Sequence, residues 1–572
     1  MTGSDAIAGL QSNIAGDGEQ ALLFPKLDEG DVGRIRRFGR ECGFDKGERL
    51  ISAGATSPGM FVILAGKLTL NQHDGLGKIA PILMLGPGDF LAEVASLTAR
   101  TALVDAQATE RVDVIHVSPE NLRALIVAEA ALGERIVRAL VLRRVRLVKD
   151  GRSGPVIIGQ ESLPDIHRLQ TFLRRNGYPY SLTDPGDDAA SALLDQYGVT
   201  ANAVLVVCPN GPVLLNPTEE QLGNALGMVD SSANDKVFDV AIVGAGPGGL
   251  SAAVYAASEG LRVAVIDGRS FGGQAGASMR IENYLGFPTG ISGQALAGRA
   301  YVQAQKFGVH FQIPVRAVAL DCSRRESSKE FAIKLSNGRN LRSRTVVVAC
   351  GARYRRPKVA RVAEFEGRGV WYWASPVEAS FCGGAEVAVL GGGNSAGQAA
   401  VYLADYASKV HLLIRGTGLE SSMSRYLIDR IEANPRIEIH AGAELTQLDG
   451  DAHGALHSIH WRDRKSEQSR PIANIFVLIG AEPDIEWLQG CGVECDANGF
   501  VLTGAAFAAE SPSSALESSV PGVFAIGDVR CGSVKRVGAA IGEGAAVVAE
   551  IHQFLAPVYR IPAPRGDQAT RA

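Results

Sequence analysis

The stretch that decides the fold is Val237–Gly249, Val-Phe-Asp-Val-Ala-Ile-Val-Gly-Ala-Gly-Pro-Gly-Gly. An apolar run leads into a G-x-G-x-x-G pattern at Gly244, Gly246 and Gly249, and an alanine-rich stretch follows. This order predicts a buried strand, a tight turn and a helix, which is the context in which the glycine pattern is informative. We therefore expect a phosphate-binding turn at Gly244–Gly249.

A second turn of the same kind follows further along the chain. The apolar run Val387–Leu390 precedes Gly-Gly-Gly-Asn-Ser-Ala at Gly391–Ala396, and another alanine-rich stretch comes next. Glycines let the backbone approach a pyrophosphate, whose charge is stabilised by the free N–H groups of a helix N-terminus. Two such turns imply two dinucleotides that exchange electrons, so the sequence predicts an oxidoreductase.

Length and composition set the class of protein. The chain has 572 residues, which at about 150 residues per domain suggests roughly four domains. Its formal charge of −4 gives no reason to expect nucleic acid or a membrane as partner. The uncharged run Val240–Ser258 contains the first glycine turn and a proline, so we expect a strand and helix there, not a membrane span. Met1–Gly18 lacks the features of a signal peptide, and a cytoplasmic location is expected.

Cysteine and histidine spacing predicts no metal site and no disulfide framework. The eight cysteines include no C-x-x-C pair. Cys491 and Cys495 are the closest pair, and we expect them to be structural and reduced. The ten histidines do not cluster at metal-ligand spacing, so no metal is predicted.

Three polar or basic stretches, Arg146–Pro155, Val229–Lys236 and Val558–Ala572, separate the parts of the chain, and the last of them is expected to fray. The fold class that follows is a multidomain protein with a β-roll, a thioredoxin-like α/β domain and two Rossmann-like dinucleotide-binding domains. The expected domains are residues 19–150, 154–228, 237–356 together with 471–556, and an inserted domain at 357–470.

The first domain reads as short strands ended by glycines, with a helix from about Ala131 to Lys149. Its stretches Phe44-Asp-Lys-Gly-Glu and Gly88-Asp-Phe-Leu-Ala-Glu, in this order, resemble the cyclic-nucleotide-binding β-roll. Cyclic AMP or cyclic GMP is the ligand that this resemblance implies. It assigns Glu93 to the ribose 2′-hydroxyl and Arg100 and Thr101 to the cyclic phosphate, a role that suits the guanidinium fork.

The β-roll departs from that family in two respects. Ala92 stands where the family usually has glycine, and Glu93 lies only seven residues before Arg100, so the phosphate-binding cassette is short. Two hypotheses therefore remain open, a cyclic-nucleotide-binding domain and a β-roll retained for docking or dimerisation.

The second domain alternates strand and helix character in a βαβαββα order, which is similar to thioredoxin or glutaredoxin. The redox cysteines of that fold would fall near Gln160–Asp165, where the sequence has none. We expect a redox-inactive adaptor.

From Phe238 onward the chain resembles the low-molecular-weight thioredoxin reductases, two-dinucleotide flavoproteins. Landmarks of that family occur in order, among them Gly272-Gly-Gln, Ile281-Glu-Asn-Tyr and Val523-Phe-Ala-Ile-Gly-Asp-Val. The resemblance implies FAD as cofactor and a homodimer. The residues expected at FAD are Gly244, Gly246, Pro247, Gly248, Gly249, Asp267, Gly273, Gln274, Asn283, Gly527 and Asp528.

The second glycine turn lies in the inserted unit, which resembles the NAD(P)H domain of the same family. The residues expected at the nicotinamide dinucleotide are Gly391, Gly393, Asn394, Ser395, Ala396 and Arg415. Arg415 ends the second strand of that unit, where a carboxylate would favour NADH, so NADPH is favoured. Gly416 breaks the arginine pair that is usual in the family, and NADH stays an alternative.

The C-x-x-C of thioredoxin reductases is missing. Trp373 and Pro376 occupy the two cysteine positions, and neither can act as a thiolate in a mixed disulfide. Cys382 is nearby, but a single thiol cannot close a ring disulfide. We therefore expect no reduction of thioredoxin by the usual route.

The predicted function is an FAD-dependent NAD(P)H oxidoreductase that the β-roll gates. Hydride arrival at a flavin needs no acid or base, so no catalytic residue is named. The acceptor is open among a quinone, dioxygen, a redox protein and an external disulfide. The alternatives are a thioredoxin-disulfide reductase that uses other cysteines, and a non-catalytic sensor of flavin state or cyclic nucleotide.

Overall fold

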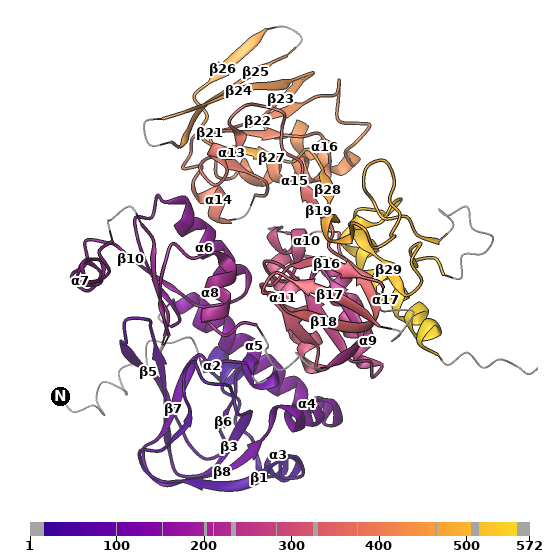
Figure 1. The fold of residues 1–572 in the computed structure, drawn as a ribbon. Coiled ribbons are helices and arrows are strands. Elements are labelled where there is room, and N and C mark those ends of the chain that lie inside the picture. The colour runs from indigo at the N-terminus through magenta and orange to yellow at the C-terminus, as the bar shows by residue number, and fades with distance from the viewer. Residues whose placement is uncertain are drawn as a thin grey trace, which may run out of the picture.

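The computed structural model describes residues 17–556 except for 99, 152, 200–202, 210, 230–235, 279, 282, 324–329, 375, 452–453, 464–465 and 505–513. The expected linker Val229–Lys236 lies mostly outside the described residues, and the expected tail Val558–Ala572 lies wholly outside them. The chain forms a β-roll, a smaller middle unit and two larger units, one around a mixed sheet and one around a parallel sheet (Figure 1). We call the larger units the first and the second dinucleotide unit. The multidomain fold class is thereby confirmed.

The β-roll consists of two four-stranded antiparallel sheets. Their strands are β1 (Arg40–Phe44), β8 (Val112–Val117), β3 (Met60–Ala65) and β6 (Phe90–Leu91) in one sheet, and β2 (Arg49–Ile51), β7 (Val104–Ala108), β4 (Leu68–His73) and β5 (Ile79–Leu85) in the other. β4 alternates between buried and half-buried residues, as a strand with one face on the core should. Helices α2 (Asp17–Leu23) and α3 (Glu29–Ile35) precede the roll.

Two helices follow the β-roll, α4 (Pro119–Ala128) and α5 (Ala130–Asp150). The second confirms the helix expected from about Ala131 to Lys149. It ends at Gly151, whose φ of 59° is the left-handed conformation that closes many helices.

The middle unit has the elements β9 (Val156–Ile158), α6 (Pro164–Arg175), β10 (Ser181–Thr183), α7 (Asp188–Tyr197), β11 (Leu205–Val207), β12 (Val213–Leu215) and α8 (Glu219–Ala225). This is the βαβαββα order that the sequence predicts. The sheet order is β10-β9-β11-β12, with β10 parallel to β9 and the last two strands antiparallel to their neighbours.

The first dinucleotide unit contains a seven-stranded sheet of order β15-β14-β13-β18-β17-β16, with β29 paired to β18. Its strands are β13 (Val237–Val243), β14 (Val263–Ile266), β15 (His310–Gln312), β16 (Ala317–Asp321), β17 (Phe331–Leu335), β18 (Asn340–Val348) and β29 (Val523–Ala525). β13 is buried at six consecutive residues, as expected of a parallel strand covered on both faces. Helices α9 (Pro247–Ser258), α11 (Gly293–Lys306) and α17 (Val537–Leu555) pack on this sheet.

The second dinucleotide unit is inserted between β18 and β29 of the first. It has a parallel sheet of order β20-β27-β21-β22-β23. The strands are β20 (Val370–Trp371), β21 (Glu386–Leu390), β22 (Lys409–Ile414), β23 (Ile437–Ala441) and β27 (Ile475–Val477). A three-stranded antiparallel sheet accompanies it, β24 (Glu444–Gly450), β25 (Leu456–Arg462) and β26 (Glu467–Arg470). Helices α13 (Val362–Phe365), α14 (Pro376–Ser380), α15 (Asn394–Leu403) and α16 (Arg425–Glu432) complete the unit.

The chain passes between the two dinucleotide units along the antiparallel pair β19 (Ala352–Tyr354) and β28 (Ala481–Pro483). Within the described part of the chain, no helix combines the length and the apolar character that crossing a bilayer requires.

Candidate functional site

The first glycine turn connects β13 to α9 and leaves the helix N-terminus open. Gly244 has a φ of 114°, and a Cβ there would lie 2.2 Å from the carbonyl oxygen of Ala349, so only glycine fits. A Cβ on Gly249 would lie 1.9 Å from the Gly244 carbonyl oxygen. At Gly246 a Cβ would meet only the Cα of Gly273, 4.0 Å away. The backbone is therefore bare where a pyrophosphate would rest on the amides that begin α9.

Asp267, directly after β14, ties this turn to the next loop. One carboxylate oxygen accepts a hydrogen bond from the backbone N–H of Ala245 at 2.9 Å. The other accepts from Arg269 N at 2.9 Å and Ser270 N at 3.1 Å. Burial raises the pKa of Asp267, and the three amide hydrogen bonds oppose that rise. The carboxylate thus organises the two loops beside the helix N-terminus.

Three other predicted FAD residues follow in this region. Gly273 begins the short helix α10 (Gly273–Ala277) and approaches Gly246 closely. Gln274 donates to the carbonyl oxygen of Ala352 at 2.5 Å, at the start of the crossing to the second unit. Asn283 is exposed and directly follows the gap at 282 in the described chain. Its predicted role stays a prediction.

Gly527 and Asp528 lie in a short 3-10 helix, Gly527–Val529, which Ile526 separates from β29. Gly527 N donates to Glu543 Oε2 at 2.6 Å, and Arg530 pairs with the other Glu543 oxygen at 2.5 Å. Burial raises the pKa of Asp528, while Lys535 lowers it. Because β29 and β13 run parallel on either side of the end of β18, Gly527 and the Gly244 turn open at the same carboxyl edge of the sheet. Dinucleotides bind at such edges.

The second glycine turn repeats the first. Gly391 has a φ of 142°, and a Cβ there would lie 2.2 Å from the carbonyl oxygen of Leu478 and 3.3 Å from the Cβ of Ala396. Gly393 caps α15, which begins at Asn394. The Asn394 side chain accepts a hydrogen bond from Ser424 N at 2.7 Å.

Two further predicted residues of the second site are open to solvent. Ser395, in the first turn of α15, is exposed, and so is Arg415, which follows β22 directly. Among the described residues, Arg415 forms no ion pair, so its guanidinium is available to a phosphate. Arg425, which begins α16, is bound to Asp429 at 2.7 Å.

The two units meet where thioredoxin reductases carry their dithiol. Trp373 is half-buried and donates its indole N–H to Glu378 Oε1 at 2.9 Å. The Arg269 guanidinium lies 5.6 Å from the centroid of the Trp373 ring, and the centroid of the Tyr354 ring lies 6.3 Å from that of Trp373. Pro376 begins α14. An aromatic residue, Trp373, therefore occupies a position at which the family has a cysteine.

Cys382 cannot replace the lost dithiol. Its side chain is 1% exposed, and its thiol contacts the Glu378 carbonyl oxygen at 3.6 Å. Burial raises the pKa of this thiol to about 11, so it is neutral and unreactive at physiological pH. Burial likewise raises the pKa of Cys350, at the end of β18, to about 12. By contrast, a hydrogen bond from Cys322 lowers the pKa of Cys491 to about 7.

The three residues predicted to bind a cyclic nucleotide contact three different parts of the protein. Glu93 is buried inside the β-roll, where Oε1 accepts from Leu103 N at 2.9 Å. Its Oε2 has no hydrogen-bond donor among the described residues, and the Arg144 guanidinium is 3.9 Å away. Burial therefore raises the pKa of Glu93.

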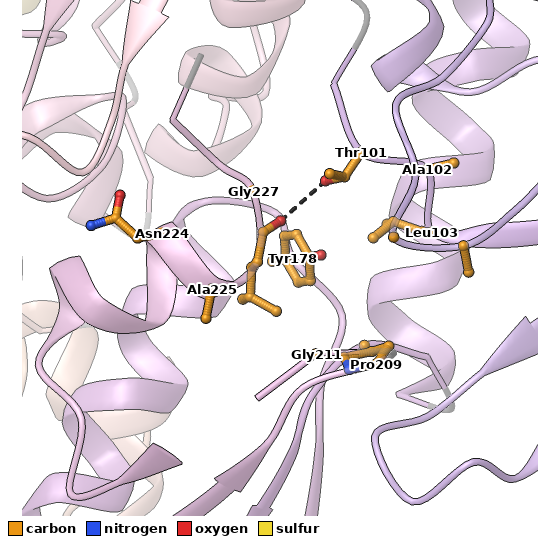
Figure 2. Close-up of a pocket in the computed structure, with 13 residues that line it drawn as sticks. Thr101, Ala102, Leu103, Tyr178, Pro209, Gly211, Asn224, Ala225 and Gly227 are labelled. Carbon is orange, nitrogen blue, oxygen red and sulfur yellow. Dashed lines mark hydrogen bonds between the residues drawn. The ribbon is translucent and has the colours of Figure 1, made fainter. Parts of the chain in front are cut away.

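Arg100 and Thr101 point to neighbouring units. Arg100 donates to the hydroxyl of Tyr301 in α11 at 2.5 Å and to the carbonyl oxygen of Phe311 in β15 at 3.2 Å. Thr101 donates to the carbonyl oxygen of Leu226, at the end of α8, at 3.1 Å (Figure 2).

A small cavity of about 160 Å³ lies at this junction of the β-roll and the middle unit. Figure 2 shows its lining, with Thr101 and Leu103 from the roll and Tyr178 and Asn224 from the middle unit. Ligand pockets usually measure roughly 300–1,000 Å³. This junction would have to open to admit a cyclic nucleotide.

Sequence reasoning missed the residues by which the middle unit reaches the first dinucleotide unit. Arg175, which ends α6, donates to the carbonyl oxygen of Gly273 at 2.5 Å. Asn176 donates to the carbonyl oxygen of Arg269 at 3.0 Å, and Glu219 of α8 pairs with Arg269 at 3.3 Å. No motif marks these residues, because their partners lie between 50 and 98 positions away in the sequence.

The Arg175 side chain is half-buried and incompletely hydrogen-bonded. Its Nε is buried and has no acceptor within the part of the chain that is described. Burial lowers the pKa of Arg175, and the adjacent Arg269 lowers it further. Two neighbouring guanidinium groups beside the Gly273 loop favour an anion there.

Comparisons with known proteins agree with this geometry. Residues 238–544 match the family described as pyridine nucleotide-disulphide oxidoreductase, and residues 41–129 match the cyclic nucleotide-binding domain. The thioredoxin reductase of Aquifex aeolicus is 32% identical over 56% of this chain and 94% of its own length. The NADPH-dependent thioredoxin reductase 3 of Arabidopsis thaliana is 32% identical over 57% of this chain, but the match spans only 60% of that protein.

Among solved structures, thioredoxin reductase from T. acidophilum superposes with a TM-score of 0.50 and 27% identity, covering 56% of this chain and 99% of its own. The matching family profile spans more than half of the chain and includes both glycine turns. The chain therefore belongs to the pyridine nucleotide-disulphide oxidoreductase family, within which it is thioredoxin reductase-like, and it also contains a stretch that matches the cyclic nucleotide-binding domain.

Proposed function

We propose that this protein oxidises NADPH and delivers the electrons to an acceptor directly from its flavin, without a protein dithiol. The observation that carries the proposal is the replacement of the family's dithiol by Trp373, packed against Arg269 and Tyr354 of the first unit. FAD, when bound, supplies the hydride-accepting and electron-donating chemistry. The protein chain binds and orients the cofactor, and it excludes electron transfer through a dithiol.

The residues around the first glycine turn fit FAD. The open helix N-terminus at Gly246 and Pro247 would hold the pyrophosphate. Gly273 and Gln274 would line the same cofactor, and Asp528 would face its polyol chain. The cationic Arg175 of the middle unit would add a charge-assisted contact to the pyrophosphate side, because its Nε is buried without an acceptor among the described residues.

The second glycine turn fits a nicotinamide dinucleotide with a 2′-phosphate. Gly391 and Gly393 leave the start of α15 accessible to the pyrophosphate. The exposed Arg415 stands at the end of β22, where a carboxylate would have accepted the ribose hydroxyls of NADH. This charge supports NADPH as the electron donor.

The absence of a usable thiol beside Trp373 constrains the acceptor. Cys382 is buried and protonated, so it cannot attack a disulfide. The acceptor must therefore approach the reduced flavin itself, which suits a quinone, dioxygen or a one-electron redox protein better than thioredoxin.

The two N-terminal parts are proposed to gate this reaction. Arg100, which the family resemblance assigns to a cyclic phosphate, is occupied by Tyr301 and Phe311. A cyclic phosphate and the first dinucleotide unit cannot both hold this guanidinium. Cyclic nucleotide would therefore release the β-roll, and docking would weaken cyclic-nucleotide binding by the same factor.

Release of the β-roll would also free the middle unit through Thr101 and the Leu226 carbonyl. That unit contacts the first dinucleotide unit through Arg175 and the second through His167, whose ring lies 4.9 Å from that of Phe381. A bridge across both units restrains their relative motion, so cyclic nucleotide is expected to raise turnover.

The test is anaerobic mixing of the flavin-loaded protein with NADPH or NADH, followed by an acceptor screen. Rapid bleaching of the flavin band by NADPH, reduction of a quinone or dioxygen, and no turnover with thioredoxin are the expected results. Failure of both nicotinamides to bleach the flavin would refute the proposed function. Turnover of thioredoxin that is lost in Cys491→Ser would instead favour a dithiol elsewhere in the chain.

A further inference from the structure

A group of metal-ligating side chains lies on the second dinucleotide unit, on β22 and on the edge strand β23 that pairs with it. In the parallel register, His411 on β22 is opposite Glu438 on β23, and Leu413 is opposite His440. Because side chains two apart share a face of a strand, Glu438 and His440 lie on the face that His411 also uses. The two histidines are 29 residues apart in sequence, which hides the cluster from any spacing rule.

The ligand atoms are close enough for one cation to hold them. His411 Nδ1 lies 3.0 Å from His440 Nε2. Glu438 Oε2 lies 3.9 Å from His411 Nδ1, and Glu438 Oε1 lies 3.8 Å from His440 Nε2. One ligand atom from each of the three residues falls within a span of 4.8 Å. Zinc bonds of about 2.0–2.2 Å place neighbouring ligands of a tetrahedron roughly 3.3–3.5 Å apart, so only small side-chain shifts are needed.

A carboxylate orients one of the imidazoles for coordination. His411 Nε2 lies 3.0 Å from Glu386 Oε2 on β21. An ionised carboxylate only accepts, so the ring nitrogen that faces Glu386 carries the proton. When this ring is neutral, its Nδ1 carries a free lone pair, which points toward His440 and Glu438. Metal-bound histidines are commonly held by a carboxylate in this way.

Glu438 already binds one cationic group, because its carboxylate pairs with the ammonium group of Lys409. Lys409 is 40% exposed, so its ammonium group can move to solvent when a divalent ion replaces it.

A buried aromatic wall closes the cluster on one side. Trp461 of β25 is fully buried, with its ring 5.8 Å from that of His411 and 5.2 Å from that of His440. Its indole N–H has no acceptor among the residues described. A water on the metal would offer an acceptor to this side of the cluster.

We propose that His411, Glu438 and His440 bind a divalent transition-metal ion, with zinc as the cation that best suits two imidazoles and one carboxylate. The fourth position is open to water, as in sites with three protein ligands. The ion joins β22 to the edge strand β23 beneath the β24–β26 sheet, and so it stabilises the nicotinamide-binding unit. The proposal is independent of the electron acceptor and of cyclic-nucleotide gating.

The test uses untagged full-length protein stripped with EDTA and titrated with Co²⁺ alone, followed by competition with Zn²⁺. The wild type is expected to give a visible d–d absorption that saturates at one equivalent and disappears when Zn²⁺ is added. The His440→Gln and Glu438→Gln variants are expected to lose at least tenfold in Co²⁺ affinity. The matched control is His460→Gln, because His460 lies on the neighbouring β25 and contacts Asp449.

A thermal readout distinguishes loss of metal from loss of fold. Zn²⁺ is expected to raise the Tm of the stripped wild type and of His460→Gln, but not that of His440→Gln. If His440→Gln does not fold, Glu386→Gln replaces it, with about tenfold weaker binding expected. A wild-type protein with no Co²⁺ absorption, or with the same affinity in all variants, would overturn the proposal.

Discussion

Arg100 of the β-roll donates a hydrogen bond to the hydroxyl of Tyr301 in the first dinucleotide unit, 201 residues further along the chain. The same guanidinium reaches the Phe311 carbonyl oxygen and lies 5.8 Å from the centre of the Tyr301 ring. The residue expected to bind a cyclic phosphate is thus the residue that docks the β-roll on the oxidoreductase. Because Arg100 serves both contacts, binding of a cyclic nucleotide should compete with docking of the β-roll on the first dinucleotide unit.

Removal of the Tyr301 hydroxyl tests that competition. Tyr301→Phe keeps the ring but removes the acceptor of a charged hydrogen bond, which contributes about 1.5–3 kcal/mol. The variant is expected to bind cyclic AMP or cyclic GMP about tenfold more tightly than the wild type and to turn over faster without ligand. Isothermal titration calorimetry and NADPH oxidation rates measure the two effects.

Arg100→Ala is the matched comparison, because it removes docking and phosphate recognition together. It should lose calorimetric binding of both cyclic nucleotides while its basal turnover rises as in Tyr301→Phe. Unchanged cyclic-nucleotide affinity in both variants would show that Arg100 does not link the two events.

Arg175 is expected to strengthen FAD binding from outside the dinucleotide fold. Arg175→Met retains the apolar stem and removes the charge beside the Gly273 loop. We expect FAD affinity to fall about tenfold, as for a lost contact of about 1.4 kcal/mol. Flavin fluorescence during titration of the apoprotein measures the affinity, and circular dichroism reports on folding.

The control for that variant is Arg174→Gln, since Arg174 is the exposed neighbour of Arg175 and its side chain donates to Tyr180 of the same middle unit. Equal FAD affinity in Arg175→Met and the wild type would remove Arg175 from the cofactor site.

The buried Glu93 makes stability depend on pH. Folding raises the pKa of this carboxyl above its unfolded value, mainly through burial. Ionisation therefore costs the folded state stability as pH rises from the unfolded pKa through the folded one. Glu93→Gln cannot ionise, so it should match the wild type near pH 4.5 and exceed its Tm by a few degrees at pH 8.

Differential scanning calorimetry of the β-roll transition at several pH values measures this difference. The Leu103 N–H can still donate to the glutamine oxygen, so the packing is largely kept. If the Tm difference between Glu93→Gln and the wild type does not change with pH, then Glu93 has the same protonation state in the folded and the unfolded protein.

The parts of the fold that depend on residues close together in the sequence could be predicted. The turns at Gly244 and Gly391 were predictable, because each needs glycine where the backbone approaches a carbonyl oxygen at positive φ. The βαβαββα order of the middle unit was also predictable, since its short apolar runs are separated by turn residues. The replacement of a family cysteine by Trp373 was visible from comparing the sequence with the family pattern.

Contacts between units could not be predicted in this way. Nothing near Arg100 indicates Tyr301, and nothing near Arg175 indicates Gly273, because each pair is joined only by the packing of separate units. His411 and His440 meet through the register of two parallel strands, which sequence spacing does not encode. Predicted cofactor residues such as Asn283 and Ser395 remain predictions until a ligand is bound.

The measurement that tests the central claim most directly is the stoichiometry of anaerobic reduction. Flavin-loaded protein is titrated with NADPH while the flavin band is followed, and dithionite titration provides the reference. If no protein dithiol takes part, full bleaching requires one equivalent of NADPH for each FAD. A disulfide is a further two-electron couple, so a requirement for two equivalents would contradict delivery of electrons directly from the flavin.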